Sequence, residues 1–183
     1  MKRTLWIVSG GAEAVPGIER ARAMGLHVVV SDMNPSAPGF AVADDTVVAN
    51  TYDVDETVAA ASKYHKGTRP IDGIMCMAAD VPLTVASVAA ALNLPGIPVE
   101  SARLAADKLA MKQAFARAGI PIPWYQAIAS LDELRAAIAE RGLPLVLKPV
   151  DGRGARGVLR LTGTTDVAWA FAHATSQSRS GGV

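Results

Sequence analysis

Short apolar runs separated by amphipathic segments fill the first hundred residues of the chain. The runs lie near Leu5, His27, Thr46 and Ile71, and each has the length of a β-strand buried in a sheet. The helices predicted between and after them cover Pro16–Gly25, Asp53–His65 and Val81–Leu92. Because strands and helices alternate, the pattern predicts a doubly wound α/β domain with parallel strands and right-handed crossovers.

The pattern changes after about residue 100, where a long helical stretch is followed by a proline-rich break. Ser130-Leu131-Asp132-Glu133 has the form of a capping box, S-x-x-E, and indicates the start of a helix. The elements predicted here are a helix over Ser101–Ala118, a strand over Trp124–Ile128, a helix from Ser130 to Gly142, a last helix over Asp166–Thr175 and a disordered tail over Ser176–Val183. We therefore expect two domains, residues 1–100 and residues 101–183.

A glycine-rich hexapeptide, G-x-G-x-x-G, lies between two short apolar runs in the second half. A dinucleotide fingerprint needs a helix to begin within this motif, but Val158–Leu161 alternates like a strand, so the loop is predicted to join two strands. Such a hairpin can cover nucleotide phosphates, because glycines let backbone N–H groups approach the oxygens and arginines add positive charge. An ordinary solvated hairpin is the alternative. The candidate phosphate-binding residues are Gly152, Arg153, Gly154, Ala155, Arg156 and Gly157.

Lys148 interrupts the apolar run Leu145–Val150 just before this loop. A lysine in a buried strand needs an anionic partner, because desolvating an unpaired ammonium is costly. A phosphate bound by the adjacent loop would supply that partner. The alternative is a lysine at a strand end whose ammonium reaches water.

Composition narrows the classes of function. The 183 residues are 50% apolar and carry a net charge of +1, so bulk electrostatics favour neither a nucleic-acid nor a membrane partner. No apolar run reaches the length of a signal-peptide core or a transmembrane helix. Cys76 is the single cysteine, which fits a reducing compartment, and the three histidines show no metal-ligand spacing. These features predict a cytoplasmic protein without a metal site of its own.

A glycine turn also follows the first predicted strand. Gly10 and Gly11 precede a helix whose N-terminus could bind an anion, such as a substrate carboxylate or phosphate. A purely structural turn is the alternative. Asp32 ends the second strand, where an acidic residue binds ribose in nicotinamide-dependent enzymes, but the G-x-G-x-x-G spacing is missing here. An oxidoreductase is therefore a third hypothesis.

Four segments occur in an order that resembles the N-terminal half of ATP-grasp enzymes of the biotin carboxylase and carbamoyl-phosphate synthetase type. The segments are Ala43–Val47, Ala106–Leu109, Ala118–Pro123 and Leu143–Pro149 with the glycine hairpin after it. The resemblance extends from about Leu5 to Ala172. It implies a Rossmann-like pre-ATP-grasp domain over residues 1–100, and over residues 101–183 a linking helix with the first, incomplete part of an α+β ATP-grasp domain.

The resemblance also implies an activity and a set of roles. Lys108 and Lys148 match the two family lysines that reach the phosphates of ATP, and Gly152–Gly157 matches the loop over the β- and γ-phosphates. Members of the family use ATP to convert a carboxylate, or bicarbonate, to an acyl phosphate, which an amine or another nucleophile then attacks. Small-molecule substrates and a possible homodimer are implied as well.

The family's magnesium ligands and catalytic arginine match nothing in this sequence, so no catalytic residue is assigned here. With ATP and Mg²⁺ as expected cofactors, the metal ligands are expected outside this chain, and the chain alone is expected to be inactive. The alternatives are a non-catalytic protein that binds a small ligand or nucleotide, or one piece of a split enzyme.

Overall fold

The computed structural model describes residues 2–183. They form two compact units, and the boundary along the chain lies between Ala106 and Asp107. The sequence placed the boundary at residue 100. In the structure, helix α4 (Val99–Ala106) belongs to the first unit, where it packs against α3 (Pro82–Ala91).

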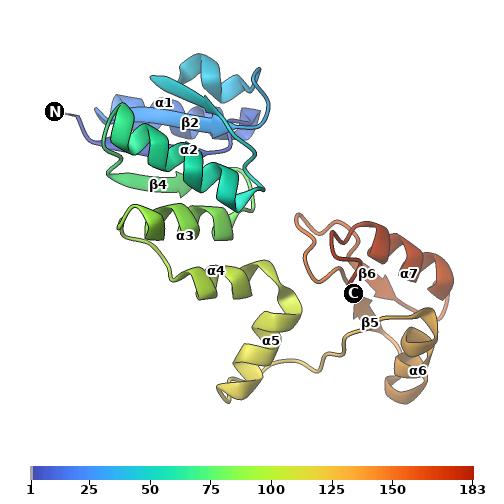
Figure 1. Cartoon of the computed structure of the whole chain (residues 1–183). Coiled ribbons are helices and arrows are strands. Elements are labelled where there is room, and N and C mark those ends of the chain that lie inside the picture. Colours follow the sequence, from blue (N-terminus) through green and yellow to red (C-terminus); the bar gives the residue numbers. More distant parts are fainter. Residues whose placement is uncertain (1) are drawn as a thin grey trace. The chain divides into compact units, whose positions relative to one another are not determined.

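The first unit is built on a parallel sheet of four strands in the order β3-β2-β1-β4 (Figure 1). The strands are β1 (Thr4–Val8), β2 (His27–Asp32), β3 (Asp45–Val48) and β4 (Gly73–Cys76). The helices around them are α1 (Val15–Ala23), α2 (Val54–Gly67) and α3, with short 3₁₀ turns η1 (Ala12–Ala14) and η2 (Pro38–Val42). The predicted parallel α/β fold is confirmed.

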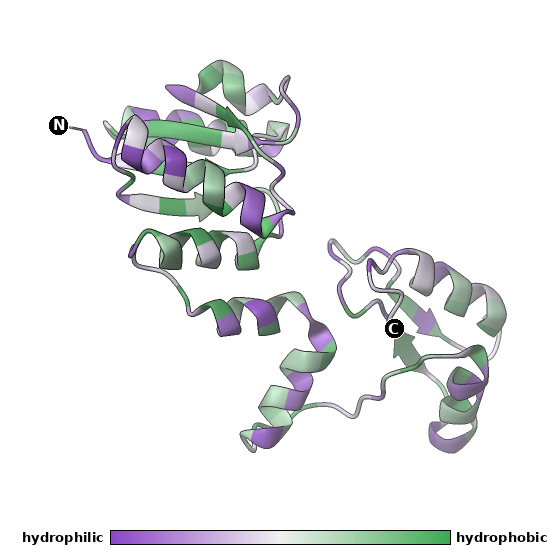
Figure 2. Ribbon diagram, in the orientation of Figure 1, coloured by the Kyte–Doolittle hydropathy of each residue, from purple (hydrophilic) through white to green (hydrophobic). Residues whose placement is uncertain are grey.

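Both faces of this sheet are covered, as expected for a doubly wound domain. Trp6, Val8 and Val29 point to one face and pack with residues of α2 and α3. Ile7 and Val30 point to the other face, where α1 packs. In Figure 2 the strands are mainly hydrophobic, whereas α2 carries hydrophilic residues on its outward side. Since successive residues of a strand face opposite ways, a continuous apolar run is what a sheet covered on both faces requires.

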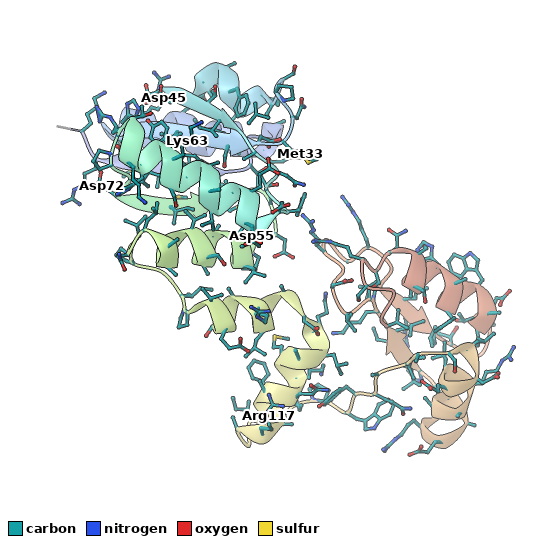
Figure 3. The ribbon with its side chains drawn as sticks, in the orientation of Figure 1. Met33, Asp45, Asp55, Lys63, Asp72 and Arg117 are labelled. Atoms are coloured by element: carbon teal, nitrogen blue, oxygen red, sulfur yellow. The ribbon has the colours of Figure 1, made fainter. Side chains whose placement is uncertain are left out.

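A polar cluster lies at the end of the sheet where the strands begin. His27 Nε2 lies 2.7 Å from Asp45 Oδ2, and the Tyr64 hydroxyl donates to the same oxygen at 2.6 Å. Figure 3 shows Asp45 at this end, whereas Met33 lies at the opposite end of the sheet. The hydrogen bonds from Tyr64 and His27 lower the pKa of Asp45. Burial together with the Asp45 carboxylate raises the pKa of Tyr64.

The Asp45 cluster predicts a loss of stability in acid. A carboxyl whose pKa is lowered in the folded state contributes stability above its unfolded pKa, near the ordinary value of 3.8, and loses it as the pH falls through the folded pKa. We expect Asp45→Asn to lower the free energy of unfolding at pH 7, because it removes the charged partner of His27 and Tyr64. The loss should be only about 1 kcal/mol, because the carboxylate is partly exposed. The difference between wild type and variant should shrink below about pH 4. Urea unfolding at pH 7, 5 and 3 measures this, and a constant difference would contradict it.

The second unit contains a two-stranded antiparallel sheet and three helices. Strand β5 (Leu145–Leu147) pairs with β6 (Leu159–Leu161). The helices are α5 (Lys108–Arg117), α6 (Leu131–Arg141) and α7 (Val167–Ser176). The core of the unit is formed by Ile128, Leu134, Ala137, Leu147, Leu161, Ala170, Ala174 and Val183. Ser130 caps α6 as predicted, since its side chain accepts from the Glu133 amide.

Three predictions for this half were wrong. The single helix expected over Ser101–Ala118 is broken at Asp107, whose carboxylate caps α5 by accepting from the amides of residues 109 and 110. The segment Trp124–Ile128 forms no strand ladder. The tail expected to be disordered is folded back, since the Ile128 amide donates to Val183 O at 2.9 Å.

Candidate functional site

The glycine loop joins β5 to β6, which confirms the hairpin predicted from its sequence. At its tip the Arg156 amide donates to Arg153 O at 3.2 Å. The two residues between them have positive φ angles, 59° at Gly154 and 58° at Ala155. Consecutive left-handed residues are typical of tight hairpin turns, and glycine adopts this conformation without the steric cost that alanine carries. A Cβ added to Gly154 would meet no atom within 4 Å, so the space beside the tip is open.

The base of the loop is packed tightly. A Cβ on Gly152 would lie 2.9 Å from Pro149 Cβ, and a Cβ on Gly157 would lie 2.8 Å from atoms of Pro149 and Gln177. Gly157 also has a φ of 69°. Both glycines are therefore required by the fold of the hairpin, which brings the two ends of the loop together over a buried proline.

Lys108 connects the start of α5 to this base. Its ammonium donates to Gly152 O at 2.5 Å and to Val150 O at 3.4 Å, and its backbone amide donates to Val150 O at 2.9 Å. The structure therefore brings together Lys108 and the glycine loop, which lie more than 40 positions apart in the sequence. Lys108 is held by backbone carbonyls here, so an anion would have to share or replace these partners.

Lys148 follows the last residue of β5 and is half-buried. Among residues 2–183, no hydrogen bond or ion pair to its ammonium is present. The strand-end position is the one that the snorkelling alternative required. Even so, its side chain lines a cavity rather than an open surface.

The cavity has a volume of about 480 Å³ and lies wholly within the second unit. One wall is the segment from Pro123 to Ile128, and the other is the stretch from Pro144 to Val150, which includes β5. Three lysines line it, namely Lys108, Lys112 and Lys148. Lys112 also lies over the ring of Tyr125, with its ammonium 5.2 Å from the ring centroid.

The arrangement combines an apolar slot with a group of cations. A volume of this size falls in the range of sites for small organic ligands, roughly 300–1,000 Å³. Apolar walls can hold a flat ring, and the lysines can neutralise an attached anion. In the part of the chain that the structure describes, no three acidic, histidine or cysteine side chains gather as a metal site. The chemistry that fits is binding of an aromatic molecule that carries negative charge.

Gly10 and Gly11 lie in the first unit, in the turn after β1. The Gly10 amide donates to Asp32 Oδ2 at 2.8 Å, and Gly10 O accepts from the Gly39 amide at 2.7 Å. Asp32 also accepts from the Asn34 amide, so its carboxylate is engaged within its own turn. These contacts account structurally for Gly10 and Asp32. The anion-binding role of Gly10 and Gly11 and the ribose-binding role of Asp32 stay predictions.

Sequence reasoning missed two features of the second unit. Lys112 lines the cavity, and only its spacing of four residues from Lys108 on one helix could have indicated this. Asp151 accepts from the Ser178 hydroxyl at 2.7 Å and from the amides of Arg179 and Ser180. No sequence pattern predicts the contact of Asp151 with residues 178–180, because these donors lie in the segment expected to be disordered.

Comparison with known proteins identifies relatives that cover most of this chain. The family model described as the ATP-grasp N-terminal domain matches residues 18–96. An uncharacterized protein, y4rH, of Sinorhizobium fredii is 33% identical over 143 residues, 77% of this chain and 30% of the relative. The formate-dependent phosphoribosylglycinamide formyltransferase of Burkholderia thailandensis is 30% identical over 186 residues, 94% of this chain and 42% of the relative. The chain thus spans less than half the length of these relatives.

Solved structures show the same fold. The L-amino acid ligase of Bacillus licheniformis superposes with a TM-score of 0.69 at 23% identity, over 94% of this chain and 41% of that one. The N5-carboxyaminoimidazole synthetase of Staphylococcus aureus, solved with ADP, gives a TM-score of 0.73 at 21% identity, over 97% and 46% of the two chains. No helix in residues 2–183 is long and apolar enough to cross a membrane.

Proposed function

We propose that the second unit binds the phosphates of ATP, on the premise that the chain belongs to the ATP-grasp superfamily. It corresponds to the N-terminal half of the ligases of this superfamily. The whole enzyme would be a carboxylate–amine ligase, in which ATP activates a carboxylate or bicarbonate for attack by an amine or another nucleophile. We place it in the cytoplasm with small-molecule substrates, and a homodimer is its expected assembly.

The observation that carries this proposal is the environment of Lys148. Lys148 is half-buried and lines a cavity of about 480 Å³, and its ammonium has no anionic partner among residues 2–183. Partial burial of an unpaired cation costs free energy, which a bound anion recovers. Adjacent apolar walls would hold the base of a nucleotide, and the charge of the triphosphate would lie toward the lysines.

The glycine loop would supply backbone N–H donors to the phosphates, in addition to the Lys148 ammonium. Its left-handed residues Gly154 and Ala155 turn successive amides at the tip, and such turns form concave sites for anions. Lys108 fixes the base of the loop through Gly152 O, and in this proposal its ammonium would also contact the triphosphate. When bound, ATP supplies a phosphoryl group for transfer, and positioning together with charge neutralisation is the main contribution of the protein to such a transfer.

Magnesium does not fit the described residues in the same way. Hard divalent cations are held by several oxygen ligands, and residues 2–183 present no cluster of this kind. We therefore propose that ligands for Mg²⁺ come from outside these residues. The assignments made above for Lys148, Lys108 and the loop do not depend on the metal.

Titration of the full chain with nucleotides tests the proposal. We expect adenylyl imidodiphosphate, a non-hydrolysable triphosphate, to bind at least about tenfold more tightly than adenosine, because charge-assisted hydrogen bonds contribute more than 1.4 kcal/mol. Raising the salt concentration should reduce the difference, since the contacts are partly exposed to solvent. Isothermal titration calorimetry measures both constants, and equal affinities would overturn the proposal.

Turnover by the chain alone is expected to be absent. Phosphoryl transfer needs metal ions that bridge the phosphates, and the described residues hold no group of ligands for them. Purified residues 1–183 with ATP, magnesium and candidate acids should release phosphate at the rate of the buffer blank. Magnesium-dependent release that is lost in Lys148→Ala would show that the metal ligands have been misplaced.

A further inference from the structure

Asp151 lies at the base of the glycine loop, between the two residues whose carbonyls bind Lys108. Its Oδ1 accepts from the Ser178 hydroxyl at 2.7 Å and the Arg179 amide at 3.0 Å, and its Oδ2 accepts from the Ser180 amide at 2.9 Å. Burial alone would raise the pKa of Asp151, but the hydrogen bonds from Ser178 and from the two amides outweigh it and lower the pKa. The carboxylate is therefore charged and fully engaged near neutral pH.

The residues on either side of Asp151 are held from other directions. Val150 O and Gly152 O accept from the Lys108 ammonium, and the Val150 amide donates to Gly182 O at 3.1 Å. At the start of the loop, Val150 and Gly152 are thus fixed by α5 through their carbonyls, and Asp151 between them is fixed by the segment after α7 through its side chain. The exposed residues 154–156 at the tip have only hydrogen bonds from within the loop in the described structure, namely Arg156 amide to Arg153 O and Val158 amide to Ala155 O.

We propose that Asp151 is a positioning residue for the phosphate loop, a role that rests on the nucleotide-binding function proposed above. Its carboxylate fixes the backbone of residues 150–152 in the orientation that presents their carbonyls to Lys108. The same contacts fix where the loop tip starts, so the tip loses less conformational freedom when it closes over phosphates. Pre-ordering a loop in this way raises affinity without adding any contact to the ligand.

The chemistry of the contact makes the carboxylate specific. Both carboxylate oxygens accept hydrogen bonds from the segment after α7, and an amide side chain has only one accepting oxygen. In Asp151→Asn the amide nitrogen would face a donor, either the Ser180 amide or the pair formed by Ser178 and Arg179. The substitution therefore keeps the size of the side chain but breaks the hydrogen bonds on one side of it, either from Ser180 or from Ser178 and Arg179. Ser178→Ala removes one of the three hydrogen bonds and should act more weakly.

The test compares two ligands on the full chain and its variants. Adenylyl imidodiphosphate reports the phosphate loop, and adenosine reports the rest of the site. We expect Asp151→Asn to weaken triphosphate binding about tenfold, the size of one to two charge-assisted hydrogen bonds. Adenosine binding should stay within about twofold, because Asp151 does not line the cavity and, of the wall formed by residues 144–150, only Val150 belongs to the segment that Asp151 fixes. Ser178→Ala should lie between wild type and Asp151→Asn.

Trypsin gives a second readout, because Arg153 and Arg156 lie in the loop itself. We expect trypsin to cut the loop of Asp151→Asn several-fold faster than that of wild type. Bound triphosphate should protect the loop less in the variant than in wild type. Asp166→Asn is the matched control, since Asp166 accepts two amide hydrogen bonds as the cap of α7 and does not line the cavity. This variant should match wild type in the ratio of the two affinities and in cleavage of the loop.

The outcomes separate this inference from the proposed function. If wild type binds triphosphate and adenosine equally, the proposed function fails, whatever the variants do. If wild type prefers the triphosphate and Asp151→Asn has the same preference and the same cleavage rate, Asp151 does not position the loop. Equal weakening of both ligands in Asp151→Asn would also overturn the inference, because it would indicate general damage to the unit.

Discussion

Gly39→Ala is expected to lower the free energy of unfolding of the first unit by about 2–3 kcal/mol, the cost of overpacking a site that cannot relax. Gly39 is buried in η2, and its amide donates to Gly10 O at 2.7 Å. An added Cβ would lie 2.8 Å from Gly10 Cα, 2.9 Å from Gly10 O and 2.7 Å from Ile18 Cδ1. Two of these atoms belong to the backbone, so a change of side-chain rotamer cannot remove the clash.

Gly67→Ala is the matched control for this substitution. Gly67 ends α2 in the same unit, and a Cβ there would meet no atom within 4 Å. Replacing a glycine in a helix with alanine should leave stability unchanged or raise it slightly. Urea unfolding monitored by hydrogen exchange of the β1 and β2 amides measures the unfolding free energy of this unit separately from that of the second unit. An unfolding free energy for Gly39→Ala within 0.5 kcal/mol of wild type would show that the turn moves apart at little cost.

The close approach of Gly39 to Gly10 also bears on the predicted anion site. Gly10 is required where two turns touch, and its amide is already bonded to Asp32. A glycine at this position thus has a packing explanation that needs no ligand. From sequence alone the two explanations could not be separated, because Gly39 lies in a loop whose path follows no local pattern.

The first unit was readable from sequence because its signals are local and repeated. A continuous apolar run such as Val28–Val30 is buried on both faces only in a parallel sheet with helices on each side. Each strand therefore predicts the layers that cover it. The crossover rule then limits the topology to a few arrangements, and the structure has one of them.

The second unit was less readable because distant contacts decide its structure. Asp107 lies inside the stretch that was predicted as one helix, yet its side chain caps α5 and divides the stretch. Residues 124–128 have the composition of a strand, but a strand also needs a partner, and Ile128 finds only Val183. The serine- and glycine-rich tail is ordered by Asp151, which lies 27 positions before Ser178.

The candidate site divides in the same way. Lys148 and the glycine loop were proposed as site residues because they are neighbours in sequence and their residue types suit phosphate. Lys108 was proposed only through the resemblance to a family, and its carbonyl partners were not foreseen. The phosphate-binding roles of all three stay predictions. Lys112 and Asp151 were missed, since what marks them is their position in the folded unit.

Lys148→Ala is expected to weaken binding of adenylyl imidodiphosphate by about 1.5–3 kcal/mol, roughly 10- to 150-fold, the range for hydrogen bonds to charged groups. Among the three lysines that line the cavity, Lys108 is held by carbonyls and Lys112 lies over Tyr125. Lys148 is the one whose ammonium has no partner among residues 2–183, so it has the most to gain from an anion. Folding should survive, because Lys148 is a half-buried residue outside the core cluster of this unit.

Two further variants identify what the ammonium contributes. Lys148→Arg should recover only part of the loss, because a planar guanidinium does not occupy the position of a compact ammonium. Lys112→Ala should have a smaller effect than Lys148→Ala, since its charge is already directed at an aromatic ring. Calorimetric titration of each variant, with circular dichroism to verify folding, gives the order of affinities. If Lys148→Ala binds the triphosphate as tightly as wild type and keeps its fold, the ammonium reaches water and the hairpin is a solvated turn.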